Sequence, residues 1–300
     1  MPNYTYPRSD TVKNLFGITN YDDFERIEAA IVTARYAEII AGHGPQDQFD
    51  ADHIKALHRH LFQDIYEWAG RTRDERVALS DGTIACEPNL RKAAGHPFAI
   101  GPAIPIALAA LAEQLRAANY LRGLTRQEFA ERAADVMAGI NTVHPFREGN
   151  GRLQRVFVEQ LANAAGHDLD FTVISKERMI RASVAAHEHR DTSMMRRMFD
   201  EISDPIRVSM LRVSIAALEK LNVAWNDRYV ATLAPGHSVK LVLAGVAGDR
   251  FMARTQSEIL FGQTADLPRP PPEPGQTFTI TPTPTIVPTP IAKHGLRPKR

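Results

Sequence analysis

The sequence predicts a mainly α-helical protein that carries a small β-rich domain towards its C-terminus. Apolar residues recur at helical spacing along most of the chain up to about residue 221. From about residue 228 onward, short β-rich runs separated by glycines replace that pattern. Nine prolines between residues 268 and 290 then favour an extended segment that cannot bury a core. We therefore expect a helical domain over residues 1–204, a helix with a small β-barrel over 205–266, and a disordered proline-rich tail over 267–300.

The predicted helices are amphipathic, and several have clear start or stop signals. Thr125 and Glu128 form a capping box at the start of one helix, and Pro145 ends it, because the residue before a proline is pushed away from helical dihedrals. In an earlier helix, His58 and His60 are two residues apart and do not face each other, so we expect a packing or surface pair and not a metal site. The predicted helices cover residues 22–41, 52–66, 104–118, 125–143, 151–165, 176–187, 191–202 and 206–221.

The composition is that of an ordinary globular protein. The chain is 44% apolar and its net charge is +1, which argues against a strongly basic nucleic-acid binder. Cys86 is the only cysteine, so an internal disulfide framework is excluded. No run of about 18 apolar residues occurs, and we expect no membrane span.

Two short apolar runs flank an Asp-Gly turn between residues 74 and 88. The runs cover residues 77–79 and 84–86, and this arrangement is typical of a β-hairpin. Taken alone, it predicts an unremarkable surface hairpin.

The loop between the two central helices, residues 144–155, is the most informative stretch, and it reads HPFREGNGRLQR. Its GNG turn leads straight into a helix N-terminus, where unpaired backbone N–H groups and a partial positive charge favour anions, phosphate above all. Arg152 and Arg155 are three residues apart, so both side chains can lie on one helix face towards that anion site.

Two further side chains of this loop suit a transfer reaction. Glu148 is a hard oxygen ligand of the kind that Mg²⁺ takes alongside substrate phosphates. His144 is the group here that titrates near neutral pH, as a general base should. A phosphate site, a metal carboxylate and a base so close together predict a nucleotide-dependent transferase.

The loop also fits every position of the pattern H-x-F-x-[DE]-G-N-[GK]-R-x-x-R, and the chain therefore resembles the Fic (filamentation induced by cAMP) domain proteins. Residues 66–73, YEWAGRTR, resemble the Y-E-W-A-G-x-x-R block that precedes the active-site flap in many Fic domains. The resemblance implies a helical-bundle fold with protein adenylyltransferase activity, the transfer of AMP from ATP to hydroxyl side chains of target proteins.

The resemblance also assigns roles to the loop. His144 would take the proton from a Ser, Thr or Tyr hydroxyl of the target, and Glu148 would hold Mg²⁺ between phosphates of ATP. The GNG turn would bind the α- and β-phosphate oxygens, and the two arginines would anchor the β- and γ-phosphates so that pyrophosphate leaves. The expected nucleotide-binding residues of the loop are Gly149, Asn150, Gly151, Arg152 and Arg155.

In the resembled family, the hairpin is a flap that holds a segment of the target protein by strand addition. Thr83 and Ile84 on that hairpin are accordingly expected beside the nucleotide. Family geometry also suggests that Leu121 and Gly123 border the base or ribose and that Arg126 contacts the nucleotide.

The β-rich runs after residue 228 suggest a small barrel of the OB type. The barrel lacks a dense basic or aromatic face, so we expect an interaction role and no nucleic-acid partner. The combination of Fic domain, OB-like domain and tail is similar to Fic effectors of type IV secretion systems and to related Fic toxins of conjugative plasmids. It implies a protein of the bacterial cytoplasm that is delivered to a recipient or host cell in such relatives, although the tail is too short for their delivery domain.

Many Fic proteins are held inactive by a helix with the pattern [ST]-x-x-x-E-[GN], whose glutamate pairs with the final arginine of the motif. This chain lacks the pattern, since Thr19 to Asp23 has the spacing but carries aspartate, followed by Phe24. We therefore expect a small antitoxin-like partner protein that supplies such a helix and places its glutamate on Arg155.

Two alternatives stay open from the sequence. The same fold can transfer UMP, phosphocholine or phosphate, but phosphate transfer in the Doc branch goes with a lysine where this chain has Gly151, which favours AMP. The chain could also be a catalytically idle adaptor, an alternative that the intact motif argues against.

Overall fold

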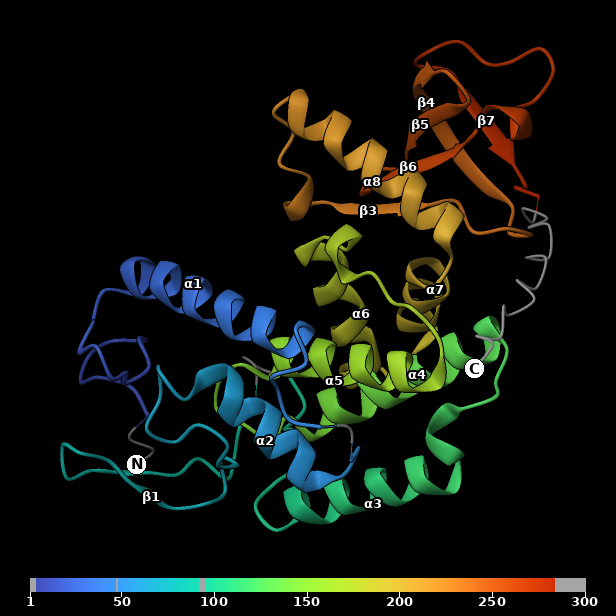
Figure 1. The fold of residues 1–300 in the computed structure, drawn as a ribbon. Helices are drawn as coiled ribbons and strands as arrows, with labels where there is room; N and C mark the ends of the chain where they lie inside the picture. Colours follow the sequence, from blue (N-terminus) through green and yellow to red (C-terminus); the bar gives the residue numbers. More distant parts are fainter. Residues whose placement is uncertain (1–3, 47, 92–94, 284–300) are drawn as a thin grey trace, which may run out of the picture. The chain divides into compact units, whose positions relative to one another are not determined.

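A computed structural model describes residues 4–46, 48–91 and 95–283 of the chain (Figure 1). The chain forms two compact units, the first ending at Arg212 and the second beginning at Val213. This division falls inside the helix of residues 205–220. The sequence had instead predicted a boundary before that helix, at residue 204. The predicted tail beyond residue 283 lies outside the described residues. Within the described part, no helix is long and apolar enough to cross a membrane.

The helices lie where their apolar periodicity predicted them. Asn20 caps the N-terminus of the first helix, where its side chain accepts a hydrogen bond from the Asp23 N–H. The capping box of Thr125 and Glu128 is present as expected. The helices are α1 (Tyr21–Ile40), α2 (Ala51–Phe62), α3 (Ala103–Ala117), α4 (Arg126–Val143), α5 (Asn150–Ala165), α6 (Lys176–Glu188), α7 (Ser193–Ile202) and α8 (Pro205–Lys220).

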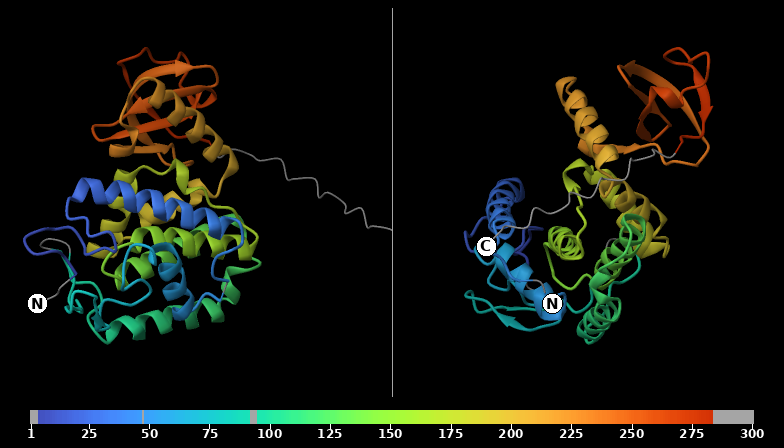
Figure 2. Two further views of the ribbon diagram at one scale, coloured as in Figure 1. Left: turned by 60° about the vertical axis from the view of Figure 1, so that its left-hand side comes forward. Right: turned by 45° about the vertical axis from the view of Figure 1, so that its right-hand side comes forward.

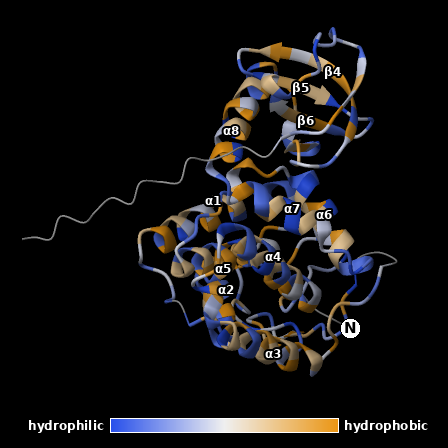
Figure 3. Cartoon of the chain, turned by 90° about the vertical axis from the view of Figure 1, so that its right-hand side faces the viewer, coloured by the Kyte–Doolittle hydropathy of each residue, from blue (hydrophilic) through white to orange (hydrophobic). Residues whose placement is uncertain are grey.

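Helix α5 lies at the centre of the first unit and packs against both α2 and α4 (Figure 2). Apolar and polar residues alternate around these helices (Figure 3). Leu153, Phe157 and Leu161 of α5 are all fully buried. Burying side chains of this size contributes about 1.5–3 kcal/mol each. The N-terminus of α5 is therefore held rigidly at the point where the loop 144–149 enters it.

The predicted hairpin is confirmed. Strands β1 (Val77–Ala78) and β2 (Ile84–Ala85) pair antiparallel, with Val77 opposite Ala85. Lys13 fixes the turn, because its Nζ lies 2.8 Å from both Asp81 Oδ2 and Thr83 Oγ1.

The second unit contains one five-stranded sheet, in the order β3-β6-β5-β4-β7. Strands β3 and β6 are parallel, and the other neighbours are antiparallel. A small β-rich domain is thus confirmed, but in the described residues β3 and β7 are edges and do not close a barrel. The strands are β3 (Tyr229–Thr232), β4 (Val239–Ala247), β5 (Arg250–Arg254), β6 (Glu258–Gln263) and β7 (Thr277–Ile280).

Strand β7 corrects the prediction that a disordered segment begins at residue 267. Phe278 and Ile280 alternate with exposed threonines and are 8% and 5% exposed. Phe278 pairs with Leu241 of β4. The short proline-free stretch around β7 can join the ladder because its N–H groups are intact, although prolines flank it on both sides.

Candidate active site

The loop between α4 and α5 bends sharply at both ends. His144 ends α4 with φ 47°, and Gly149 precedes α5 with φ 81°. A Cβ atom at position 149 would lie 2.3 Å from Cζ of Phe62, a distance that real Cβ atoms do not reach. Glycine is therefore required at position 149 by its backbone conformation and by the adjacent ring.

The side chain of Asn150 is buried and holds the loop closed. Its Oδ1 accepts a hydrogen bond from the Phe146 N–H at 3.0 Å, and its Nδ2 donates to the Phe146 carbonyl at 2.8 Å. Both atoms of the amide are thus used to shape the loop, and a contact of Asn150 with the nucleotide stays a prediction. The start of α5 also offers backbone N–H groups, which favour anions at a helix N-terminus.

His58 of α2 contacts the loop and supports it. The sequence had not predicted this role. Its Nδ1 accepts a hydrogen bond from the Gly70 N–H at 2.9 Å, so its Nε2 carries the proton and donates to the Glu148 carbonyl at 3.1 Å. The ring stacks on Phe146 with centroids 3.8 Å apart. Burial lowers the pKa of His58 to about 3 and keeps the imidazole neutral.

Arg73 ties the loop to the segment that follows the hairpin. It is fully buried, and its guanidinium donates to backbone carbonyls of both segments, among them His144 at 2.8 Å and Pro88 at 2.7 Å. Its backbone N–H also donates to the Pro145 carbonyl at 2.8 Å. Removing this side chain would leave several buried carbonyls without a donor.

The imidazole of His144 is oriented by aromatic stacking. It lies parallel to Phe98, with centroids 4.0 Å apart, and Phe98 stacks in turn on His187 at 4.4 Å. The side chain is half-buried. A base at this position is thus held by both its backbone and its ring.

Glu148 is the one acidic residue of the loop, and 44% of its side chain is accessible. Its carboxylate accepts a hydrogen bond from the Gly149 N–H at 2.9 Å and lies 3.7 Å from Nη2 of Arg152. No cluster of three metal-ligating side chains occurs among the described residues. A single accessible carboxylate fits Mg²⁺, which is commonly held by one or two carboxylates together with substrate phosphates.

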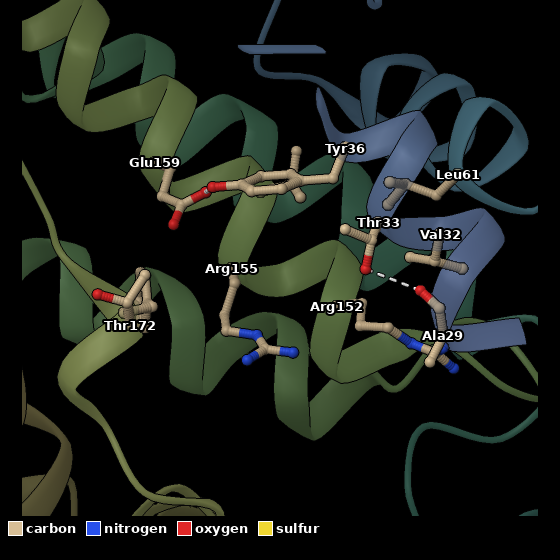
Figure 4. Close-up of a pocket in the computed structure, with 11 residues that line it drawn as sticks. Ala29, Val32, Thr33, Tyr36, Leu61, Arg152, Arg155, Glu159 and Thr172 are labelled. Atoms are coloured by element: carbon tan, nitrogen blue, oxygen red, sulfur yellow. Dashed lines mark hydrogen bonds between the residues drawn. The ribbon is translucent and has the colours of Figure 1, made fainter. Parts of the chain in front are cut away.

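A cavity of about 290 Å³ lies between α1 and α5, and both arginines of the motif line it (Figure 4). Arg152 lies over the Phe62 ring at 4.9 Å and pairs with Glu28 at 2.9 Å. Burial by itself would lower the pKa of Arg152, but its hydrogen bond to Glu28 and that carboxylate's charge outweigh burial and raise it. Arg155 has no hydrogen bond or ion pair with any other described residue, and burial lowers its pKa.

An acid from the next turn of α5 shares this cavity. The Tyr36 hydroxyl donates to Glu159 Oε2 at 2.7 Å (Figure 4). Burial raises the pKa of Glu159 to about 7, although the hydrogen bond from Tyr36 and the positive charge of Arg155 act in the opposite direction. The cavity therefore offers one unpaired cation beside a carboxyl group that titrates near neutrality.

Three of the predicted nucleotide contacts, Leu121, Gly123 and Arg126, lie towards the C-terminal end of α5. Arg122, between Leu121 and Gly123, donates from Nε to the Ala164 carbonyl at the C-terminal end of that helix. A helix of 16 residues is about 24 Å long, so this segment lies far from the turn at the other end of α5, and its contact with the base or ribose stays a prediction. Arg126 is instead engaged with α7, where its Nη1 lies 2.9 Å from Asp200 Oδ1. Thr83 and Ile84 do lie on the hairpin, as predicted.

Comparison with known sequences places this site in a defined group. Residues 48–162 match the family model described as the Fic/DOC family. A protein adenylyltransferase of Bartonella henselae is 35% identical over 285 residues, covering 93% of this chain and 52% of the relative. Protein adenylyltransferase VbhT of Bartonella schoenbuchensis is 35% identical over an alignment that covers 61% of this chain and 35% of VbhT. The chain thus spans about half the length of the first relative and about a third of the second.

A shorter relative is covered more fully. The probable protein adenylyltransferase Fic of Escherichia coli is 33% identical, with 58% of this chain and 78% of the relative aligned. Among solved structures, the type IV secretion system effector protein BepA has a TM-score of 0.85 at 33% identity, covering 95% of this chain and 97% of BepA. BepC of Bartonella tribocorum with bound AMPPNP has a TM-score of 0.65 at 40% identity, and the match covers 68% of this chain and 97% of the BepC structure.

Proposed function

The chain belongs to the Fic/DOC family, and from this we propose that it is a protein adenylyltransferase that transfers AMP from ATP to a Ser, Thr or Tyr hydroxyl of a target protein. The observation that carries the proposal is the complete motif of residues 144–155, folded as a rigid turn that feeds the N-terminus of α5. Adenylyltransferase names among the relatives and AMPPNP bound to BepC support the same chemistry.

The proposed reaction uses the residues of the loop as follows. His144 removes the proton from the target hydroxyl, whose oxygen forms a bond to the α-phosphorus of ATP. The bond from the α-phosphorus to the bridging oxygen breaks, and pyrophosphate leaves with that electron pair. Backbone N–H groups at the start of α5 stabilise the charge that develops on the α-phosphate.

Arg152 and Arg155 bind the β- and γ-phosphates and orient pyrophosphate for departure. Glu148 would hold Mg²⁺, which when bound neutralises charge on the phosphates. The hairpin around Thr83 and Ile84 holds the target by strand addition, and its turn is kept in place by Lys13.

The experiment that tests this function follows a label. The chain is incubated with a cell lysate and with ATP labelled on either the α- or the γ-phosphate, beside a His144→Ala control. We expect protein labelling from α-labelled ATP alone, and none with the control. Labelling from γ-labelled ATP would instead indicate phosphate transfer, and no labelling together with no AMPPNP binding in calorimetry would favour the idle adaptor.

We also propose that a small partner protein inhibits the enzyme in trans, with a glutamate on Arg155. The support is that Arg155 lines an accessible cavity and has no ionic partner among the described residues. We expect toxicity when the chain is expressed alone and relief when a neighbouring reading frame with the pattern [ST]-x-x-x-E-[GN] is co-expressed. Similarity to BepA supports delivery by a type IV secretion system, which a translocation assay with a reporter fusion would test.

A further inference from the structure

Glu28 of α1 lies outside the segment that matches the family model, yet its carboxylate reaches the first arginine of the motif. Its Oε1 accepts hydrogen bonds from Nη2 of Arg152 at 2.9 Å and from the Tyr66 hydroxyl at 2.6 Å. Glu28 is 7% exposed and Tyr66 is 1% exposed. A buried carboxylate with two donors is held firmly, because an unpaired buried charge is costly.

This pairing leaves most of the arginine available. A guanidinium group carries five N–H donors in a rigid plane. Within the described part of the chain, only Nη2 of Arg152 has ionic partners, Glu28 at 2.9 Å and Glu148 at 3.7 Å. The Phe62 ring lies below the plane at 4.9 Å. Glu28 and Phe62 thus fix the orientation of the group while the donors on Nε and Nη1 stay available to phosphate oxygens.

The contact belongs to the framework of the fold. Glu28 lies in the middle of the 20-residue helix α1, and its neighbours one turn away, Phe24 and Val32, are 4% and 5% exposed. These neighbours hold the backbone of Glu28 in place, and turning its side chain away from Arg152 would take one of two donors from a buried carboxylate, so Glu28 has little freedom to leave. If Glu28 competed with phosphate for Arg152, its carboxylate would have to move away when nucleotide binds. A residue that only orients Arg152 can stay in place.

We propose that Glu28, backed by Tyr66, is a positioning residue that aims Arg152 at the β- and γ-phosphates of the nucleotide. The inference rests on the proposed function, because it assumes a nucleotide at the N-terminus of α5. AMP has only the α-phosphate and does not reach Arg152, so its binding is independent of Glu28. AMPPNP binding depends on it.

Calorimetry with AMPPNP and with AMP, both with Mg²⁺, tests this inference. Glu28→Ala should weaken AMPPNP binding about tenfold or more, the loss of one charge-assisted contact, and should leave AMP binding within about twofold. Glu25→Ala is the matched control, because Glu25 is exposed on the same helix, carries the same charge and lines a second cavity together with Glu28 and Arg152. It should leave the binding of both nucleotides unchanged.

Each other outcome overturns the inference in a distinct way. Unchanged AMPPNP binding by Glu28→Ala would remove the positioning role, and tighter binding would make Glu28 a competitor of phosphate. An equal loss of AMP binding would mean that the residue merely supports the fold. If Glu28→Ala fails to fold, Glu28→Gln decides, with AMPPNP affinity expected to fall about threefold because a neutral acceptor is about half as strong. Failure of the parent chain to bind AMPPNP would refute the proposed function instead.

Discussion

Replacing Gly149 with alanine should destabilise the first unit strongly, because two separate costs coincide at this position. The positive φ of 81° costs an alanine about 1–2 kcal/mol. Its Cβ would also meet the Phe62 ring at 2.3 Å, and overpacking of this kind costs about 1–3 kcal/mol. We therefore expect a loss of about 2–5 kcal/mol in the free energy of unfolding.

Two other glycines separate these costs. Gly123 has φ 79° but open space around its missing Cβ, so alanine there should cost only the backbone contribution, about 1–2 kcal/mol. Gly151 lies in α5 with neither a positive φ nor a close neighbour, and alanine there should be neutral or stabilise the protein by up to about 1 kcal/mol. The expected order of destabilisation is 149, then 123, then 151.

Urea unfolding monitored by tryptophan fluorescence can report on the first unit alone. Trp68 is 1% exposed in that unit, and the other tryptophan, Trp225, lies in the second unit, so a Trp225→Phe background isolates the signal. Equal losses for Gly149→Ala and Gly123→Ala would refute the role given to Phe62. A coupling free energy of about 1 kcal/mol or more between Gly149→Ala and Phe62→Leu would support it.

Three further changes probe the chemistry. His144→Ala should lower AMP transfer by about 10²–10⁴-fold while ATP binding in calorimetry stays near the parent value, since the base acts on the incoming hydroxyl. Glu148→Ala should shift the Mg²⁺ dependence of transfer to higher concentration, and a titration that overlays the parent would count against the metal role. The carboxyl pKa of Glu159 is about 7 in the folded state and near 4.5 when unfolded, so the folded state binds the proton more tightly. Stability relative to Glu159→Gln should therefore fall by up to about 3 kcal/mol as pH rises from about 4.5 to 7, measured by urea unfolding.

The parts of the fold that were predicted correctly are those governed by local rules. Helical periodicity and capping fixed α4 and α5, and the proline after His144 placed the turn between them. Strand β7 was missed because its alternation covers only residues 277–280, and the surrounding proline content dominated the prediction. The signal was present in Phe278 and Ile280, two apolar residues at strand spacing.

Placement along the axis of α5 separates the predicted site residues into two groups. The capped start of α4 and the catalytic turn are close in sequence terms, but α4 itself separates them, so residues before its N-terminus lie at the far end of α5. Leu121, Gly123 and Arg126 therefore lie about one helix length from the turn, and their contact with the nucleotide stays a prediction. No sequence pattern gives this distance unless the antiparallel packing of α4 on α5 is considered first.

The supporting groups were missed for a different reason, and one of them left a signal in the sequence. His58 falls on the apolar face of α2, four residues after Ile54 and three before Leu61, both of which are buried. A polar residue on such a face must find hydrogen-bond partners in the core, and here the partners are the Gly70 N–H and the Glu148 carbonyl. A histidine on the buried face of a helix should therefore be expected to hydrogen-bond to backbone groups in the core. It should not be treated as half of a surface pair. Arg73 is the last residue of the block 66–73, but the block does not give its supporting role, because its donors serve carbonyls that only the folded loop brings together.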